Sequence, residues 1–254
     1  MSSFAENPTI IFATGAWHTT QCFDLVREKL TKVNWPTEAV SYPSVGAEPP
    51  TKGLADDAAA VRATIEKLAG EGKQVVLVVH SYGGLVGANA VEGLGFAERQ
   101  AKGEKGGVIL FVYLAAFVTP MGGSIKQMLG GQFLPWMNFQ GDTGYVHADD
   151  PKQIFYHDVE GEQLEQALST LKHQSAPVFT DVVSYEPWHK IECLYMICEE
   201  DKALPAFIQE GMAKSLGESS QTVRIKASHS PFLSQPDAVV DGLVSSTKVV
   251  LERI

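Results

Sequence analysis

The chain has 254 residues, of which 44% are hydrophobic and 20% are charged, as in an ordinary globular protein with one large domain. The formal net charge of −10 argues against nucleic acid as a partner, because phosphate binding needs a basic face, and it disfavours an anionic membrane surface. The three cysteines, Cys22, Cys193 and Cys198, fit neither a disulfide framework nor a metal-ligand spacing, so no metal is expected.

The first residues and the lengths of the apolar segments suggest a cytoplasmic protein without a membrane segment. The first residues, MSSFAENP, lack the basic start and the long apolar core of a signal peptide. No apolar run reaches the length needed to span a membrane. A G-x-x-x-x-G-K phosphate loop is absent, and no organic cofactor is expected. A homodimer is compatible with these features.

Short apolar segments rich in β-branched residues recur along the chain and predict strands. Within each segment, apolar residues do not alternate with polar ones, which is typical of strands covered on both faces in a parallel sheet. The predicted strands are 9–14, 37–43, 74–80, 108–117, 193–198 and 222–227, of which 37–43 is the weakest.

Helical patterns separate these strands. An apolar stripe at Phe23, Val26, Leu30 and Val33 predicts a helix after the first strand. Strands that alternate with helices predict a doubly wound, mostly parallel α/β sheet with right-handed crossovers. Further helices are predicted within 53–70, directly after residue 82, near 205–216 and at 236–251.

Residues 119–190 interrupt the alternation. They contain Gly-rich turns and a helical stripe at Leu164, Ala167, Leu168 and Leu171, but no convincing central strand. An insertion of this length is too long for an ordinary connection. We expect a lid of short helices over the carboxyl ends of the strands, with residues 1–118 and 191–254 forming the core domain. The alternative is a structural excursion of the sheet.

The stretch QVVLVVHSYGG ends a predicted strand on Ser81 and continues at once into a helix. Such a sharp turn presents a hydroxyl openly and needs small neighbours, here Gly83 and Gly84. The positive end of the following helix points at the same place. We interpret Ser81 as a nucleophile; the alternative is a plain helix cap.

Four motifs in the expected order resemble the α/β-hydrolase family, and the resemblance covers essentially the whole chain. The chain is most similar to the small lidded members, such as plant methylesterases, hydroxynitrile lyases and esterase-like relatives. It departs from the family pattern in two places, since Val79 replaces the first glycine of G-x-S-x-G and Thr14 replaces a histidine before Gly15. The motifs are TGAWH (14–18), HSYGG (80–84), DKALP (201–205) and SHSPF (228–232).

This resemblance implies a Ser-His-Asp triad. His229 follows the last predicted strand, where this fold carries its catalytic histidine. The acid belongs in the loop EEDKALP, in which Glu199, Glu200 and Asp201 are candidates, and the resemblance selects Asp201. His80 is expected to point away from Ser81, into the protein.

The oxyanion hole needs two backbone N–H donors. One is expected from Tyr82, the residue after the nucleophile, and the resemblance implies Ala16 as the other. Gly15 allows the close backbone approach that this requires. Gly15 and the Trp17 and His18 that follow it in the same loop are candidate substrate contacts.

The apolar residues of the predicted lid indicate the substrate class. They include Phe133 and Trp136 as candidate substrate contacts, although these side chains equally suit the lid's own core. A small hydrophobic or aromatic ester, thioester or lactone, cleaved by a serine hydrolase, is the favoured interpretation. Hydroxynitrile lyase is disfavoured because Ser230 occupies the position of its lysine. A different lyase or carbon–carbon cleavage on the same triad, or a small-molecule receptor on a hydrolase scaffold, are the alternatives.

Overall fold

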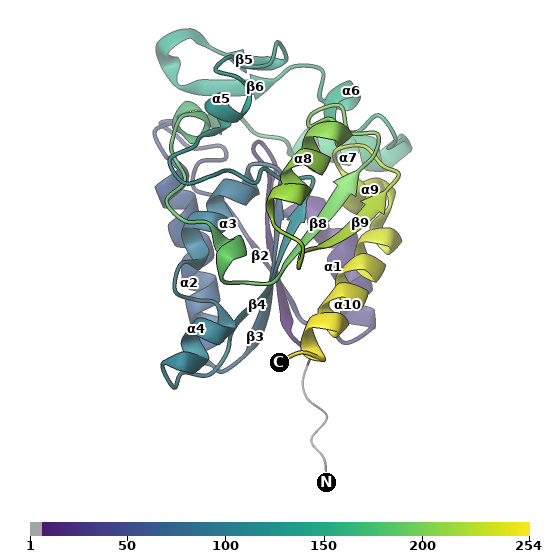
Figure 1. Ribbon diagram of the computed structural model, residues 1–254. Coiled ribbons are helices and arrows are strands. Elements are labelled where there is room, and N and C mark those ends of the chain that lie inside the picture. The colour runs from purple at the N-terminus through teal and green to yellow at the C-terminus, as the bar shows by residue number, and fades with distance from the viewer. Residues whose placement is uncertain (1–6) are drawn as a thin grey trace.

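The computed structural model describes residues 7–254, and its centre is a six-stranded sheet with the order β2-β1-β3-β4-β8-β9 (Figure 1). All neighbouring strands in this sheet are parallel. The doubly wound fold class and all six predicted strands are therefore confirmed. The strands are β1 (Thr9–Ala13), β2 (Thr37–Val40), β3 (Gln74–His80), β4 (Gly107–Leu114), β8 (Cys193–Cys198) and β9 (Gln221–Ile225).

Helices cover both faces of the sheet, as the unbroken apolar strands predict (Figure 1). One face packs against α1 and α10, and its core contains Phe12 and Val78. The opposite face packs against α2, α3 and α8, and its core contains Ile11 and Leu77. The helices outside residues 119–190 are α1 (Asp24–Lys32), α2 (Leu54–Gly70), α3 (Gly83–Val91), α4 (Phe96–Ala101), α8 (Ala206–Ser215), α9 (Pro231–Ser234) and α10 (Pro236–Leu251), with a 3-10 turn η1 (Thr20–Phe23).

Residues 119–190, called the cap segment below, lie over the carboxyl ends of the strands (Figure 1). None of their strands joins the main sheet. The segment contains short helices and, in addition to what the sequence indicated, three short strands that form a separate antiparallel sheet in the order β5-β6-β7. The elements are α5 (Ile125–Met128), β5 (Met137–Phe139), η2 (Gly141–Thr143), β6 (Tyr145–Ala148), α6 (Pro151–Phe155), α7 (Gly161–Thr170), β7 (Gln174–Ser175), η3 (Ala176–Phe179) and η4 (Pro187–His189).

No helix among residues 7–254 is both long and apolar enough to cross a membrane. The expectation about a signal peptide falls mainly on residues 1–6, which lie outside the described residues.

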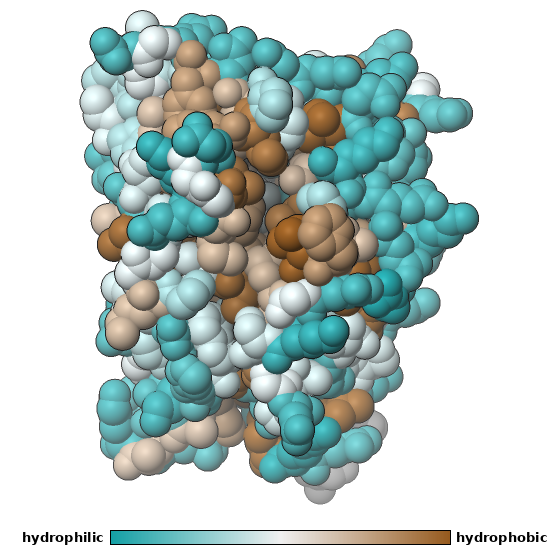
Figure 2. Space-filling view, turned by 45° about the horizontal axis from the view of Figure 1, so that its top comes forward, coloured by the Kyte–Doolittle hydropathy of each residue, from teal (hydrophilic) through white to brown (hydrophobic). Residues whose placement is uncertain are grey.

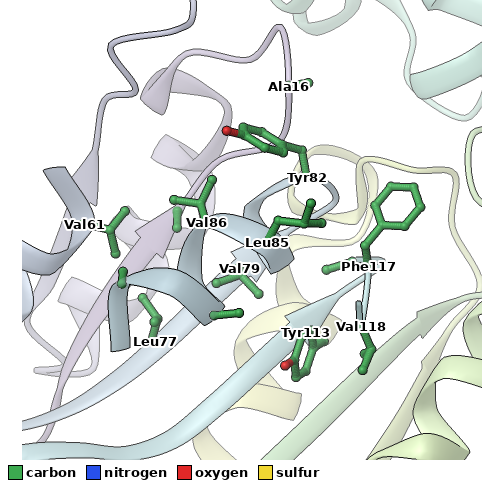
Figure 3. Close-up of a cluster of buried hydrophobic side chains, with 14 of the residues drawn as sticks. Ala16, Val61, Leu77, Val79, Tyr82, Leu85, Val86, Tyr113, Phe117 and Val118 are labelled. Carbon is green, nitrogen blue, oxygen red and sulfur yellow. The ribbon is translucent and has the colours of Figure 1, made fainter. Parts of the chain in front are cut away.

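The packing around Val79 explains how the chain accommodates a valine two residues before Ser81. Val79 is fully buried in the cluster shown in Figure 3, which also contains Leu85 and Val86 of α3. A Cβ placed on Gly87 would lie 2.5 Å from Val79 Cγ1 and 2.9 Å from the ring of Phe111. The missing side chain at Gly87 therefore supplies the room that Val79 occupies.

Gly87→Ala should consequently destabilise the protein by about 1–3 kcal/mol, because the added methyl overpacks a closed core. Gly211→Ala is the matched control, since Gly211 also lies in a helix but has no atom within 4 Å of its Cβ position. That control should be neutral or stabilise by up to about 1 kcal/mol. Urea unfolding of both variants measures the difference, and equal midpoints would contradict this packing explanation.

Candidate active site

Ser81 lies on a strained turn between β3 and α3. Its φ is 53°, a left-handed conformation that is uncommon for any residue other than glycine. The turn also requires its two glycines: a Cβ on Gly83 would lie 2.6 Å from the carbonyl oxygen of Thr14, and one on Gly84 would overlap the carbonyl oxygen of Phe117. The nucleophile turn that the sequence predicts therefore forms despite Val79.

Two backbone donors beside Ser81 are free. The N–H groups of Ala16 and Tyr82 donate no hydrogen bond to another of residues 7–254, although both residues are buried. Unpaired buried N–H groups are rare in native proteins. Both residues line the same cavity as Ser81.

The peptide between Ala16 and Trp17 is held at both of its polar ends. Its carbonyl oxygen accepts a bond from His18 Nδ1 at 2.7 Å, and its N–H donates to Gln174 Oε1 at 3.0 Å. Trp17 adopts a φ of 65°, so the loop takes a shape that it would rarely adopt alone. These contacts occupy the Trp17 N–H, whereas the Ala16 N–H stays without a partner among residues 7–254.

His229 and Asp201 form a buried pair. His229 Nδ1 donates to Asp201 Oδ2 at 2.7 Å, and both residues are less than a tenth exposed. This bond fixes the tautomer, because Nδ1 carries the proton and Nε2 is left as the basic nitrogen. His229 also lines the cavity that Ser81 lines.

Asp201 is held in place by three further donors. Its Oδ1 accepts from the backbone N–H groups of Ala203 and Leu204, and its Oδ2 also accepts from Gln209 Nε2. Gln209 is itself fully buried and bonds to the end of β8 through Cys198. Four hydrogen bonds to one carboxylate fix its orientation beside the His229 ring.

The other two carboxylates of this loop face solvent. Glu199 pairs with Arg224 at 2.7 Å, and Glu200 pairs with Lys226 at 3.6 Å, both among partly exposed side chains. Neither bonds to His229, so Asp201 alone of the three sequence candidates contacts the histidine.

An apolar cavity lies between the carboxyl ends of the strands and the cap segment. Figure 2 looks obliquely onto this side of the molecule and shows apolar side chains gathered around a hollow. Its polar wall groups are limited to Ser81, His229, His18 and the backbone beside them. The apolar lining is Trp17, Phe117, Ile125, Leu129, Leu134, Trp136, Met137, Phe155, Phe179, Ala203 and Leu204 with the Ala16 and Tyr82 positions.

Three of the five residues predicted to contact substrate line the cavity, and two do not. Trp17, His18 and Trp136 line it. Phe133, predicted to contact substrate, instead stacks on Phe139 with ring centroids 4.1 Å apart and lies behind the wall. Gly15 is also absent from the wall, because it makes room for the His80 ring, whose Nδ1 would lie 2.7 Å from a Cβ there. Thr14 leaves its buried Oγ1 without a partner among residues 7–254.

The residues on one side of the cavity were not predicted from the sequence. Phe117 follows β4, Ile125 and Leu129 belong to the start of the cap segment, and Leu204 follows the acid. The signal was available only for Leu204, since it lies inside the motif DKALP that was singled out for Asp201.

His18 and His80 are two further buried histidines beside the pair. His18 Nε2 accepts from the Tyr156 hydroxyl at 2.9 Å, so both of its nitrogens are occupied. His80 points into the protein as expected, and its Nε2 donates to the backbone oxygen of His229 at 2.9 Å. Burial lowers the pKa of His18 to about 4 and lowers the pKa of His80 well below its usual value. Both rings are therefore neutral near pH 7.

His18 should make stability fall with acidification. A depressed histidine pKa favours the unfolded state once that state protonates, so the contribution is present above about pH 6.5 and is lost as pH falls toward 4. Between pH 7 and pH 5 the loss from His18 is about 2 kcal/mol. His18→Asn should reduce the pH dependence of urea unfolding by that amount. An unchanged difference between the two pH values would contradict this origin.

No group of three His, Cys, Asp or Glu side chains within residues 7–254 is arranged to hold a metal ion. Cys22, Cys193 and Cys198 are buried free thiols, and burial raises the pKa of Cys193 to about 12.

A parallel sheet with a serine on a left-handed turn after β3, and a buried His–Asp pair whose histidine lines the same cavity, is the arrangement typical of the α/β-hydrolase class. The alpha/beta hydrolase family model matches residues 10–242, and the chain belongs to this family. An alpha/beta hydrolase, nvfD, of Aspergillus novofumigatus is 31% identical over 236 residues, which cover 92% of this chain and 94% of that protein.

Solved structures share the fold at lower identity. A pyrethroid hydrolase from Sphingobium faniae is 20% identical with a TM-score of 0.73 and covers 94% of this chain and 96% of its own. The methylesterase MES16 from Arabidopsis is 16% identical with a TM-score of 0.73 and covers 95% of this chain and 99% of its own. These similarities agree with the resemblance to plant methylesterases that the motifs carry.

Proposed function

We propose that this α/β-hydrolase is a serine esterase that cleaves small, uncharged, hydrophobic or aromatic esters, with thioesters and lactones as the neighbouring classes. The single observation that carries the proposal is one apolar cavity shared by Ser81, His229 and two free backbone donors. The histidine is already oriented by a buried carboxylate. The hydrolase and methylesterase names of the relatives support the same reaction class.

Each step of the proposed reaction uses one of these groups. The Ser81 hydroxyl attacks the ester carbonyl carbon while His229 Nε2 takes its proton. The carbonyl oxygen becomes an oxyanion, which the N–H groups of Ala16 and Tyr82 stabilise. The carbon–oxygen bond to the alcohol then breaks, and His229 returns the proton to the leaving alcohol. Water attacks the acyl-enzyme by the same route and releases the acid and the serine.

The Ser81 hydroxyl makes no hydrogen bond to another of residues 7–254, so it is free to rotate toward a substrate and His229. Serine and histidine groups commonly align fully only when substrate is bound. In this proposal the Asp201 carboxylate orients His229 and supports the imidazolium that forms on it.

The cap segment acts in this proposal as a lid that sets substrate choice. It contributes Trp136, Phe155 and Phe179 to the cavity, and no charged side chain from it lines the wall. An unpaired charge on the substrate would therefore be buried without a partner, which is costly.

A panel of p-nitrophenyl esters tests this function. The acetate, butyrate and benzoate should be hydrolysed, and an ester bearing a carboxylate of similar size should react more slowly by at least about 10-fold in kcat/KM. Hydrolysis of none of these esters, or a preference for the charged one, would contradict the proposal.

A further inference from the structure

A buried hydrogen-bond network connects the cap segment to the two residues that carry the free donors. It contains Gln174 of β7, Ser44 of the loop after β2, and Asp57 of α2, and all three side chains are fully buried. We call these three residues the Gln174 network. Neither the resemblance nor the reaction described above uses any of them.

The bonds run continuously from the peptide N–H of Trp17, the residue after Ala16, to the side chain of Tyr82. The Trp17 N–H, next to Ala16, donates to Gln174 Oε1 at 3.0 Å. Gln174 Nε2 donates to Ser44 Oγ at 2.6 Å, and Ser44 Oγ donates to Asp57 Oδ2. The Tyr82 hydroxyl donates to that same carboxylate oxygen at 2.8 Å.

Each end of the network holds one of the two backbone segments that carry the proposed oxyanion donors. At one end, Gln174 holds the peptide plane that follows Ala16, in a loop whose Trp17 conformation is strained. At the other end, the Tyr82 side chain is anchored to Asp57, and Figure 3 shows its hydroxyl pointing away from Phe117 and the cavity side. The Ser44 backbone N–H also donates to Asp57, which ties the β2 loop to the same carboxylate.

We propose that Gln174, Ser44 and Asp57 are positioning residues that hold the Ala16 and Tyr82 N–H groups at the spacing needed to bind the oxyanion. This inference rests on the serine esterase function proposed above. It makes the cap segment a structural part of the oxyanion hole, because Gln174 joins the network from β7. Trp17 reinforces the link, since its indole N–H donates to Val146 of β6 at 2.9 Å.

Breaking the network at either end should weaken binding of the oxyanion without changing binding of the apolar substrate. Gln174→Met removes both polar groups at similar length, and Tyr82→Phe removes only the hydroxyl. Each should lower kcat for p-nitrophenyl butyrate about 10- to 100-fold, since a misplaced donor costs less than a deleted one, with KM within about 2-fold.

A ketone inhibitor separates positioning from general destabilisation. An alkyl trifluoromethyl ketone forms a hemiketal: the Ser81 oxygen bonds to the carbonyl carbon, the serine proton passes to His229, and the carbonyl oxygen becomes an oxyanion. Its Ki should rise about 10- to 100-fold in both variants, in step with the loss of kcat. The Ki of the matched methyl ketone, which stays a neutral ketone, should change little.

Tyr195→Phe is the matched control, because it removes a buried tyrosine hydroxyl that bonds to the Ala116 carbonyl at 2.7 Å, outside the network. Tyr195→Phe should lose comparable thermal stability. It should retain the wild-type kcat and the wild-type ratio of the two Ki values, for the trifluoromethyl ketone and for the methyl ketone. The inference is overturned if Tyr82→Phe and Gln174→Met stay folded and keep both quantities while Ser81→Ala is inactive. Failure of the proposed function itself looks different: Ser81→Ala then retains the wild-type rate, and the trifluoromethyl ketone does not inhibit.

Discussion

Replacing Ser81 with alanine is expected to lower kcat for p-nitrophenyl acetate about 10⁶-fold, close to the background rate. The substitution deletes the only atom proposed to bond to the acyl group. Because alanine is smaller, the cavity wall and the His229–Asp201 bond should persist, and the variant should still bind the ester. A stopped assay at high enzyme concentration measures the residual rate.

Thermal unfolding serves as the control for this variant, since Ser81 contributes no side-chain hydrogen bond to the fold among residues 7–254. Removing the hydroxyl should leave the melting temperature within a few degrees. A folded Ser81→Ala enzyme that retained more than a hundredth of the wild-type kcat would show that another group performs the reaction.

Asp201→Asn is expected to lower kcat about 10⁴-fold with little change in KM. The asparagine oxygen will face the N–H groups of Ala203 and Leu204, because they need an acceptor. Its amide nitrogen then faces His229 Nδ1 and donates to it. That contact favours the imidazole tautomer with the proton on Nε2, which cannot accept a proton from Ser81.

Glu200→Gln is the matched control for this change. It also replaces one carboxylate by an amide in the same loop, but Glu200 lies at the surface beside Lys226. It should retain kcat within about 2-fold, as expected for an exposed ion pair. Equal losses in the two variants would mean that the charge of the loop matters, and would contradict a specific role for Asp201.

The sheet was predictable because its signal is local. Strands β3 and β4 are unbroken runs of buried apolar residues, and helices separate β1, β3 and β4 along the chain. The lack of polar alternation and the order of the elements together predict a doubly wound fold. The positions of Ser81, Asp201 and His229 at strand ends follow from the same pattern. Their approach to one cavity follows from parallel strands, whose carboxyl ends meet at one edge.

The cap segment was less predictable because its order depends on distant contacts. Strand β7 has two residues and β5 has three, which is too short for a periodic pattern. β7 lies where it does because Ser175 bonds to the Ser44 backbone from a loop far away in the chain. The place of Phe133 was left open for the same reason, since apolar character alone does not tell whether a side chain faces the cavity or another aromatic ring.

Long-range polar contacts also escaped the sequence. Asp57 lies in the first turn of α2, where an acidic residue is usual at the surface, yet it is fully buried and bonds to Ser44 and Tyr82. Burial raises the pKa of its carboxyl to about 6 against the opposing effect of these bonds. The room for Val79 likewise comes from Gly87, eight positions along, which a motif read at residues 79–84 does not include.

Labelling with a fluorophosphonate tests the central claim most directly, because the phosphonyl group bonds only to a serine activated by a base. We predict one adduct per chain, located on the peptide containing Ser81 by mass spectrometry. The labelling should be lost in His229→Ala and in protein unfolded by urea. An enzyme that hydrolyses esters yet stays unlabelled, or that carries the adduct on another residue, would contradict the account.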